Sequence, residues 1–250
     1  MSSTDAAAAA IAALQPLLAA APLLAGGLPP GWTDGARRYV ALLLEANQRL
    51  NLTRVVSPEA VARDHLLDAV AALPLLDAAA PARVIDLGSG GGVPAIPLAL
   101  ARPDIAWTLV DAVGKKADAL RGFVAELGLR NVTVVAERLE ALGRDKAHRE
   151  RHDLATARAC APLPVLCELA LPLLRRGGRL VAWKGPLDAA AEELRRANAA
   201  ASQLGGDDPV VMPTGVAGLG GRTFVLVEKR GTTPRRFPRR PGEPGRRPLG

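Results

Sequence analysis

Short apolar runs alternate with longer amphipathic segments along residues 83–229. Apolar runs bounded by glycine, proline or charged residues are typical of buried strands, and apolar residues at helical spacing indicate helices that cover a sheet. Strands are predicted near residues 83–87, 106–111, 131–136, 153–157, 178–183, 208–212 and 223–229. Helices are predicted between them, near residues 92–101, 114–127, 139–149, 161–175 and 187–204.

This alternation predicts an α/β fold with a doubly wound sheet of five parallel strands. Only the short segment 213–221 joins the last two strands, so we expect them to form a terminal antiparallel pair. Before the sheet, residues 36–50 are amphipathic, and Ser57-Pro58-Glu59 combines a capping residue with a first-turn proline, which is typical of a helix start. The chain is thus expected to divide into an N-terminal helical segment that packs on the core, a core domain and a tail, at residues 1–80, 81–230 and 231–250.

A glycine-rich stretch follows the first predicted strand. The chain reads Asp86-Leu-Gly-Ser-Gly-Gly-Gly-Val-Pro94 and then becomes helical in pattern. Glycines in such a turn let the backbone reverse sharply and let a ligand approach bare peptide groups. Asp86 and Asp111 each place a carboxylate at the carboxyl end of a predicted strand, where open α/β sheets bind ligands. These features together predict a site for a nucleotide-type cofactor.

The charge of Asp86 distinguishes two kinds of cofactor. Gly90, Gly92 and Ala95 fit the permissive G-x-G-x-x-A pattern of dinucleotide sites. A dinucleotide would place a doubly charged pyrophosphate beside the Asp86 carboxylate, whereas the methionine end of S-adenosylmethionine carries a positive ammonium and a positive sulfonium. The sequence therefore favours S-adenosylmethionine, and an NAD-dependent oxidoreductase is the alternative reading. A tight turn with a structural aspartate explains fewer of these residues.

The positive charge of the chain is concentrated at its C-terminal end. Of the 32 basic and 25 acidic residues, eight and one lie in residues 229–250, which leaves 24 of each elsewhere. Prolines in this tail disfavour helix and favour an extended path, and an extended arginine-rich segment suits a phosphate backbone. We therefore expect contact with RNA; a disordered solubilising tail is the alternative. The candidate RNA contacts in the tail are Arg235, Arg236, Arg239 and Arg240.

Cysteine usage and the N-terminal pattern bear on the compartment. Cys160 and Cys167 match no metal-binding spacing, so no metal is expected and a reducing compartment is indicated. Residues 6–25 are apolar, but no basic residue precedes them and Pro16 and Pro22 interrupt the run, which argues against a signal peptide or an anchor. A cytoplasmic protein, monomeric and without membrane association, is the expectation.

Taken together, these motifs resemble a known family, the bacterial small-subunit ribosomal RNA methyltransferase G (glucose-inhibited division protein B) family. The resemblance runs from about residue 30 to the end of the chain. It implies a class I S-adenosylmethionine-dependent methyltransferase fold, with a Rossmann-like sheet and an N-terminal helical cap. It also implies methylation of guanine N7 in a loop of 16S ribosomal RNA in the small subunit. The matching segments are residues 51–54, 65–68, 86–94, Asp111, 158–159, 184–185, Arg222 and 237–249.

The chain departs from the family pattern at two positions. Ala46 precedes Asn47 where the family often has tryptophan, which predicts looser packing of the helical cap. Thr223 follows Arg222 where the family often has histidine, which predicts an altered contact near the substrate. Neither position belongs to the glycine loop.

The strand-end positions and, for Leu139 and Glu140, the resemblance predict roles for individual residues. Gly88 and Gly90 would let the methionine end of the cofactor approach the backbone, with Val93 on the far side of the loop. Asp111 would bind the ribose. Leu139 and Glu140 match positions that border the adenine, with the Glu140 carboxylate or its backbone as the acceptor. Arg158 would bind the methionine carboxylate or a target phosphate, and a salt bridge to Asp86 is equally plausible for it.

Further polar residues are candidate RNA contacts, namely Asn51, His65, Lys184 and Arg222. A polar helix-face pair with Asp68 is the simpler role for His65, and a solvated strand end is the simpler role for Lys184. His148 and His152 lie in a charged run, residues 144–152, that predicts an exposed helix and turn.

The chain lacks the motifs of other nucleic-acid methylation chemistries. It has no Asn/Asp-Pro-Pro-Tyr cluster, its only tyrosine is Tyr39, and Cys160 does not fit a pyrimidine-C5 nucleophile loop. Guanine N7 carries no proton, so no catalytic acid or base is expected and catalysis would be alignment. A non-catalytic RNA-binding or ribosome assembly factor with the same cofactor fold is the second alternative.

Overall fold

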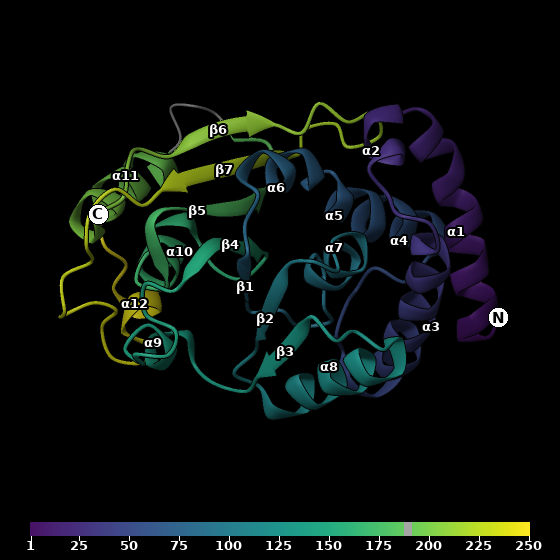
Figure 1. Cartoon of the computed structure of the whole chain (residues 1–250), viewed down its shortest axis with the longest axis horizontal. Coiled ribbons are helices and arrows are strands. Elements are labelled where there is room, and N and C mark those ends of the chain that lie inside the picture. The colour runs from purple at the N-terminus through teal and green to yellow at the C-terminus, as the bar shows by residue number, and fades with distance from the viewer. Residues whose placement is uncertain (188–191) are drawn as a thin grey trace.

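A single seven-stranded sheet forms the centre of the molecule (Figure 1). The structure is a computed structural model that describes residues 1–187 and 192–250. The strand order is β3-β2-β1-β4-β5-β7-β6; β7 runs antiparallel to both of its neighbours, whereas the four pairings among β1 to β5 are parallel. The strands are β1 (Arg83–Leu87), β2 (Ala106–Val110), β3 (Val132–Val135), β4 (His152–Arg158), β5 (Leu174–Lys184), β6 (Val210–Pro213) and β7 (Thr223–Glu228).

The five strands β1 to β5 all point the same way, so their carboxyl ends meet at one edge of the sheet. This arrangement confirms the predicted sheet of five parallel strands with a terminal antiparallel pair. Because β7 runs in the opposite direction, Thr223 at its start lies beside Lys184 at the end of β5. Glu228, at the end of β7, therefore lies at the amino edge of the parallel strands. The tail that follows β7 starts at the edge opposite to the predicted cofactor site.

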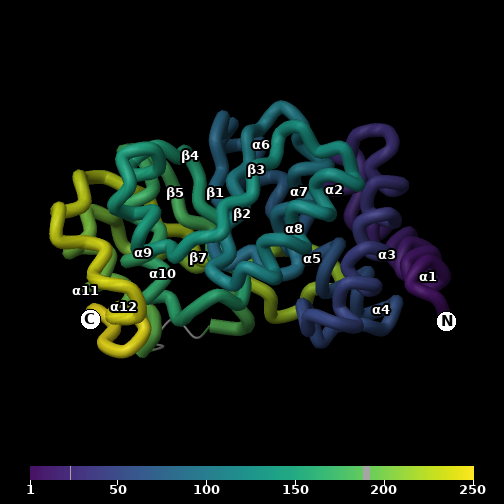
Figure 2. Tube along the Cα trace, turned by 90° about the horizontal axis from the view of Figure 1, so that it is seen from below, coloured from purple at the N-terminus to yellow at the C-terminus, as the bar shows by residue number. Residues whose placement is uncertain are grey.

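Helices cover both faces of the sheet and give three layers (Figures 1 and 2). Successive strand residues point to opposite faces; Val84 packs in the core on the side of the N-terminal helices, and Ile85 packs in the second core. The first core involves α1 (Ser3–Ala19), α3 (Trp32–Leu50), α6 (Leu73–Ala79), α7 (Ala95–Ala101) and α8 (Gly114–Leu127). The second core involves α9 (Leu139–Leu142), α10 (Leu163–Ala170) and α11 (Glu192–Leu204).

The N-terminal helices are joined to the glycine loop by specific hydrogen bonds. On α3, the Tyr39 hydroxyl donates to the carbonyl of Gly91 (2.8 Å), and the Trp32 indole donates to the carbonyl of Pro97 (2.9 Å). Both side chains are buried, and these bonds satisfy polar groups that burial would otherwise leave unpaired. The amphipathic helix predicted over residues 36–50 is confirmed by α3, whose buried face includes Tyr39 and Leu43. The remaining N-terminal helices are α2 (Pro22–Gly26), α4 (Pro58–Val61), the π-helical segment η1 (Ala62–Leu67) and α5 (Asp68–Val70).

The predicted strands are all present, whereas three predicted helices differ in extent. The helix expected near 161–175 is limited to α10, because β5 already begins at Leu174, which pairs with His152. The helix expected near 139–149 is limited to α9. The helix expected near 187–204 begins at Glu192 as described, and residues 188–191 lie outside the described part of the chain. No helix in the described ranges is long and apolar enough to cross a membrane.

The prediction of an exposed helix and turn over residues 144–152 is only partly correct: residues 144–147 are exposed and turns are present, but no helix forms over this run. His152 is the first residue of β4 and is completely buried, and its ring stacks on that of His148 with 5.7 Å between the centroids. Arg149 is directed inward, toward backbone carbonyls of residues 143 and 233–237. The charges of this run are therefore used to hold other parts of the chain, and a local pattern of charges gives no sign of such distant partners.

The expectation of an extended tail is wrong. Residues Glu243–Arg246 form a short helix, α12, and Phe237 is buried in the second core. In Figures 1 and 2 the tail lies against α9, α10 and α11. Proline residues excluded a long helix here, but they did not keep the segment away from the folded core.

The buried His152 predicts a specific dependence of stability on pH. Burial lowers the pKa of His152 to about 4, with the charges of Arg83 and His148 acting in the same direction and Asp153 opposing them. The unfolded chain therefore takes up this proton first, and stability falls as the pH drops from about 6.5 to about 4, by up to about 1.4 kcal/mol per pH unit. In His152→Gln this contribution is absent. Urea unfolding at a series of pH values should show a shallower acid loss in the variant than in the parent; parallel curves would contradict the prediction.

Candidate functional site

The carboxyl edge of the sheet gathers the predicted cofactor residues. Asp86 lies in β1, Asp111 follows β2, and Arg158 ends β4, and these strands are neighbours in the sheet. The glycine loop that begins at Gly88 is linked to β2 by the Ser89 amide, which donates to the carbonyl of Val110 (2.8 Å). The doubly wound topology therefore brings together residues that are far apart in the sequence.

The Asp86 carboxyl group is buried and half satisfied. Its Oδ1 accepts a hydrogen bond from the Thr156 hydroxyl (2.6 Å), whereas Oδ2 has no hydrogen-bond partner among the described residues. Burial raises the pKa of Asp86 to about 6; the hydrogen bonds from Thr156 and Ser89 and the charge of Arg158 oppose the rise. A buried carboxylate oxygen without a partner is costly, so its presence beside a glycine loop indicates a cationic or hydrogen-bond-donating ligand.

Asp111 organises the loop as well as facing a cavity. Its Oδ2 accepts from the amide of Gly90 (2.9 Å), and its Oδ1 accepts from the amide of Val113 (2.8 Å). A carboxylate oxygen can accept more than one hydrogen bond, so these contacts leave acceptor capacity for a ligand. The Asp111 side chain thus fixes the glycine loop in position and can still accept hydrogen bonds from a ligand.

Two cavities meet at Gly88. The first has a volume of about 300 Å³, and its walls include Gly88, Asp111, Leu139 and Glu140 together with Gly242 and Pro244 of the tail. The second has a volume of about 230 Å³, and its walls include Gly88, Val93, Leu52, Thr53, His65 and Arg158. Gly88 has a φ of +67°, and a Cβ atom there would lie 2.7 Å from the sulfur of Cys160. A side chain at this position would be strained and would clash where the two cavities join.

His65, in η1, and Asp68, the first residue of α5, form a group with Arg158. Arg158 Nε lies 3.4 Å from Asp68 Oδ2, and Arg222 Nε lies 3.3 Å from Asp68 Oδ1. Asp68 is completely buried, and burial raises its pKa while the charges of Arg158 and Arg222 oppose the rise. The expected alternative, a salt bridge from Arg158 to Asp86, is therefore corrected: the ionic partner of Arg158 is Asp68, because η1 and α5 carry it to the end of β4.

His65 is held neutral in this group. Its Nε2 lies 2.9 Å from the Thr53 hydroxyl, and its Nδ1 lies 3.2 Å from the carbonyl of Asp64 and 3.5 Å from Arg158 Nη2. Burial lowers the pKa of His65 to about 4, and the charge of Arg158 acts in the same direction. An imidazole of this kind orients its neighbours by hydrogen bonds and carries no charge at neutral pH.

Of the candidate RNA-contacting residues, some are exposed and others are engaged in ion pairs within the protein. Asn51 is exposed at the C-cap of α3, in a left-handed conformation. Lys184 ends β5 and forms an ion pair with Glu193 (2.6 Å). In the tail, Arg239 is bound to Glu168, whereas the three other candidate arginines stay exposed. These exposed arginines are Arg235, Arg236 and Arg240.

Comparison with known proteins identifies the family. The family model described as rRNA small subunit methyltransferase G matches residues 33–215. The chain is 44% identical to the ribosomal RNA small subunit methyltransferase G of Deinococcus radiodurans over 85% of this chain and 83% of that protein. It is 46% identical to the protein of that name from Chloroflexus aggregans, over 85% and 88%. The chain belongs to the rRNA small subunit methyltransferase G family. The predicted resemblance is thereby confirmed, and the NAD-dependent alternative has no support.

Solved structures of lower sequence identity agree on the fold. The O-methyltransferase TomG from Streptomyces achromogenes, solved in complex with SAM, is 20% identical, with a TM-score of 0.52 over 77% of this chain and 90% of that chain. The S-adenosylmethionine-dependent methyltransferase SibL is 18% identical, with a TM-score of 0.54 over 79% and 74%. The class I methyltransferase fold is therefore confirmed, and S-adenosylmethionine is the cofactor that goes with it.

The residues present fit this cofactor. Asp86 Oδ2 offers an unpaired buried negative charge for an ammonium, and the buried Arg158 Nη1 has no partner in the described part of the chain and suits a carboxylate. The apolar walls of the first cavity, Leu139 and Val165 among them, suit an adenine ring. Within the described ranges no cluster of three or more His, Cys, Asp or Glu side chains has a geometry that would hold a metal ion.

Sequence reasoning missed several residues of the site. Thr53 and Thr156 hold His65 and Asp86 by hydrogen bonds, yet single threonines give no recognisable pattern. Asp68 belonged to a matching motif, but only the structure shows that it joins two arginines. The tail residues that line the first cavity gave no signal except a high content of glycine and proline.

The Asp68 group predicts a large effect of a small substitution. In Asp68→Asn, the two arginines lose their carboxylate, and Arg158 is left mostly buried and unpaired. We expect a loss of about 3–5 kcal/mol in the free energy of unfolding, measured with urea at pH 7. The matched control is Asp77→Asn, which breaks the more exposed ion pair with Arg102 (2.6 Å) and should cost no more than about 1 kcal/mol. Equal effects of the two substitutions would refute the assignment.

Proposed function

We propose that this protein transfers a methyl group from S-adenosylmethionine to N7 of one guanine in a loop of 16S ribosomal RNA. The family supports the reaction class. The observation that carries the proposal is the meeting of two cavities at Gly88, one beside Asp111 and one beside Arg158. The first cavity would take the adenosine, and the second would take the methionine end and the target base.

The proposed contacts follow from the side chains at this edge. Asp86 would hold the methionine ammonium, and Arg158 would hold its carboxylate, because each has a buried polar atom without a partner in the described part of the chain. Asp111 would accept hydrogen bonds from the ribose. Leu139 would pack on the adenine, and Gly88 and Gly90 would allow close approach of the backbone. Val93 lines the second cavity, on the methionine side.

The chemistry asks little of the protein beyond alignment. S-adenosylmethionine supplies a methyl group on a positively charged sulfonium. Guanine N7 presents a lone pair without a proton, so the chain needs no general base, and the neutral His65 is consistent with a positioning role. Orientation of two reactants supplies roughly 7–11 kcal/mol. The sheet edge provides it through groups that are themselves fixed by hydrogen bonds, such as Arg158 on Asp68 and Asp111 on the loop.

For the RNA, the proposal uses the exposed basic residues near this edge and in the tail. Arg222, directly before β7, is half-buried beside Asp68, whose other partner Arg158 lines the second cavity. Asn51 is exposed at the C-cap of α3, next to Leu52, which lines the same cavity. Arg235, Arg236 and Arg240 are exposed and free to contact phosphates. We further propose a cytoplasmic monomer: in the described residues, the exposed large apolar side chains, Met1, Val56, Val113 and Val210, are few.

Methyl transfer is tested directly on ribosomal particles. Labelled S-adenosylmethionine is incubated with small subunits from cells that lack this protein, with free ribosomal RNA in parallel, and the label is mapped by cleavage specific for 7-methylguanine. We expect label at one guanine. Cofactor binding without transfer to either substrate would favour the assembly-factor alternative. Thermal stabilisation by NADH and not by S-adenosylhomocysteine would overturn the proposal.

The role of Asp86 predicts a pH-dependent cofactor affinity. Because its pKa is raised to about 6, Asp86 loses its charge as the pH falls below that value. We expect the affinity for S-adenosylhomocysteine to fall by up to about tenfold per pH unit below pH 6 in the parent. In Asp86→Asn, calorimetric titration should show weak binding at every pH from 5 to 8.

Asp104→Asn serves as the control for this titration, because Asp104 is an exposed aspartate just before β2. It should keep the parental affinity and pH profile. A parental profile in Asp86→Asn as well would exclude the proposed contact with the ammonium.

A further inference from the structure

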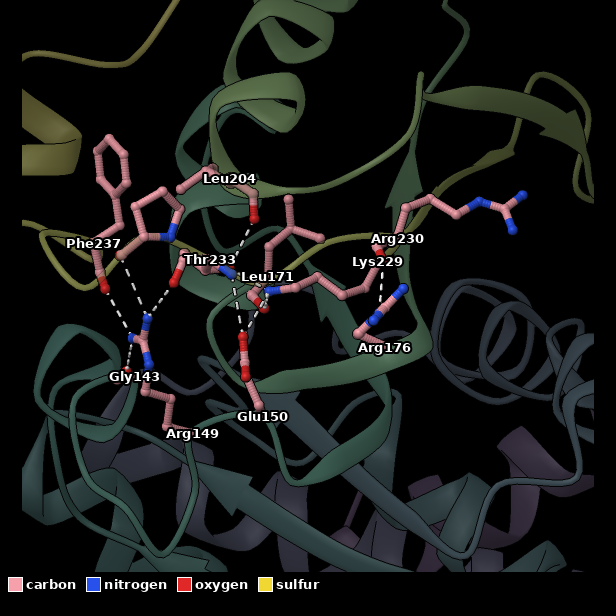
Figure 3. Close-up of polar contacts among 11 residues, drawn as sticks. Gly143, Arg149, Glu150, Leu171, Arg176, Leu204, Lys229, Arg230, Thr233 and Phe237 are labelled. Atoms are coloured by element: carbon pink, nitrogen blue, oxygen red, sulfur yellow. Dashed lines mark hydrogen bonds and ion pairs between the residues drawn. The ribbon is translucent and has the colours of Figure 1, made fainter.

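The tail is fixed to the core at its root (Figure 3). Lys229, directly after β7, is completely buried, and its ammonium donates to the carbonyl of Leu171 (2.6 Å) and to the hydroxyl of Thr233. Glu150 lies 3.6 Å from the same ammonium and accepts from the amide of Thr233 (3.1 Å). A buried ammonium with this many acceptors anchors the chain at the point where it leaves the sheet.

Arg149 extends this anchor along the tail. Its guanidinium donates to the carbonyls of Gly143 (2.6 Å), Phe237 (2.8 Å) and Thr233 (2.8 Å), as Figure 3 shows. Several carbonyls on one guanidinium fix the path of the backbone, because its donors lie in a rigid plane. The tail is thereby directed along the second core toward the carboxyl edge of the sheet.

The middle of the tail is held by one buried ion pair. Glu168, on α10, is completely buried, and Arg239 binds it at several points: the backbone amide (2.8 Å) and Nε (2.9 Å) donate to Oε1, and Nη2 (2.5 Å) donates to Oε2. A buried carboxylate requires such compensation, so this is a specific contact and not a chance encounter of surface charges.

Directly beyond this ion pair, the tail reaches the first cavity. The Gly242 amide donates to Glu140 Oε1 (2.7 Å), and Gly242, Pro244 and Gly245 line the cavity together with Asp111 and Leu139. Arg239 itself does not line the cavity. The Glu140 carboxylate, which the sequence suggested as an acceptor for the adenine, has one oxygen engaged by the tail.

We propose that the tail forms one wall of the adenosine site and that Arg239 and Glu168 are the residues that position it. This inference rests on the proposed function, in which the first cavity takes the adenosine. A wall held in place before the cofactor arrives lowers the cost of ordering on binding. The basic tail therefore has two parts: arginines that are free for RNA, and Arg239, which serves the cofactor.

Two arginines of the tail provide a matched pair of variants. Arg239→Gln removes the positioning contact, and Arg247→Gln removes the same charge from an exposed side chain beyond the cavity. We expect Arg239→Gln to raise the Kd of S-adenosylhomocysteine by about tenfold, because the wall must then be ordered when the ligand binds, and Arg247→Gln to leave it unchanged. Turnover at saturating S-adenosylmethionine and KM for small subunits should stay near parental values, so that only KM for S-adenosylmethionine rises. Parental Kd in Arg239→Gln, or a fall in kcat alone, would overturn the inference.

Glu140 gives a second comparison that does not disturb the buried ion pair. Glu140→Gln keeps an acceptor for the Gly242 amide, whereas Glu140→Ala removes it. We expect the alanine variant to bind S-adenosylhomocysteine several-fold more weakly than the glutamine variant, which keeps the anchor. Equal weakening in both would mean that the carboxylate charge acts on the cofactor directly, which contradicts its use as an anchor for the tail.

Photocrosslinking of the unaltered protein separates the inference from the proposal on which it rests. A photoreactive 8-azidoadenosyl analogue of S-adenosylmethionine is irradiated on the full chain, and the labelled peptides are identified. Label in residues 240–246 supports the tail wall. Label near Asp111 or Leu139 without label in the tail overturns the inference alone. Label at neither place shows that the cavity is not the adenosine site and overturns both.

Discussion

The buried carboxylate of Asp68 is the interaction on which the functional edge of this molecule depends. It lies between Arg158 at the end of β4 and Arg222 just before β7, and it comes from the N-terminal helices. One carboxylate thus joins three segments that are far apart in the sequence. Burial makes the group costly unless it is paired, and the two guanidiniums supply the pairing. The position of Arg158, which lines the second cavity, is a consequence of this arrangement.

The direction of β7 sets a second constraint. Because this strand runs against its neighbours, the chain leaves the sheet at the edge opposite to the cofactor site. A tail that ended there would have no part in catalysis. Instead, buried contacts at Lys229, Arg149 and Arg239 carry it across the second core to the first cavity. In a sheet of this topology, the C-terminal residues can therefore lie at the carboxyl edge only if specific contacts hold the tail along its path across the core.

The charged side chains proposed to contact the cofactor and those proposed to contact RNA lie in different parts of the molecule. Around the proposed cofactor site, carboxylates predominate: Asp86, Asp111 and Glu140 are all buried at or beside the glycine loop and the first cavity. They suit a cofactor with a positive ammonium and sulfonium. The excess of positive charge lies in exposed arginines of the tail, where a polyanion can approach from solvent. The net charge of +7 is thus not a property of the cofactor site.

The sequence by itself determined the succession of strands and helices along the chain and the glycine loop. It also determined that Asp86 and Asp111 lie at strand ends. Each of these features depends on local periodicity and on residues adjacent in the chain. Tertiary structure decided the partners of the charges. Arg239 meets Glu168 across 71 residues, and Gly242 meets Glu140 across 102. Arg158 is bound to Asp68 and not to Asp86, and His152 is buried although it ends a run rich in charged residues. Nothing in a local pattern encodes such pairings: they arise only when separate segments pack together, and the cost of burying a charge then selects the arrangement in which it is matched.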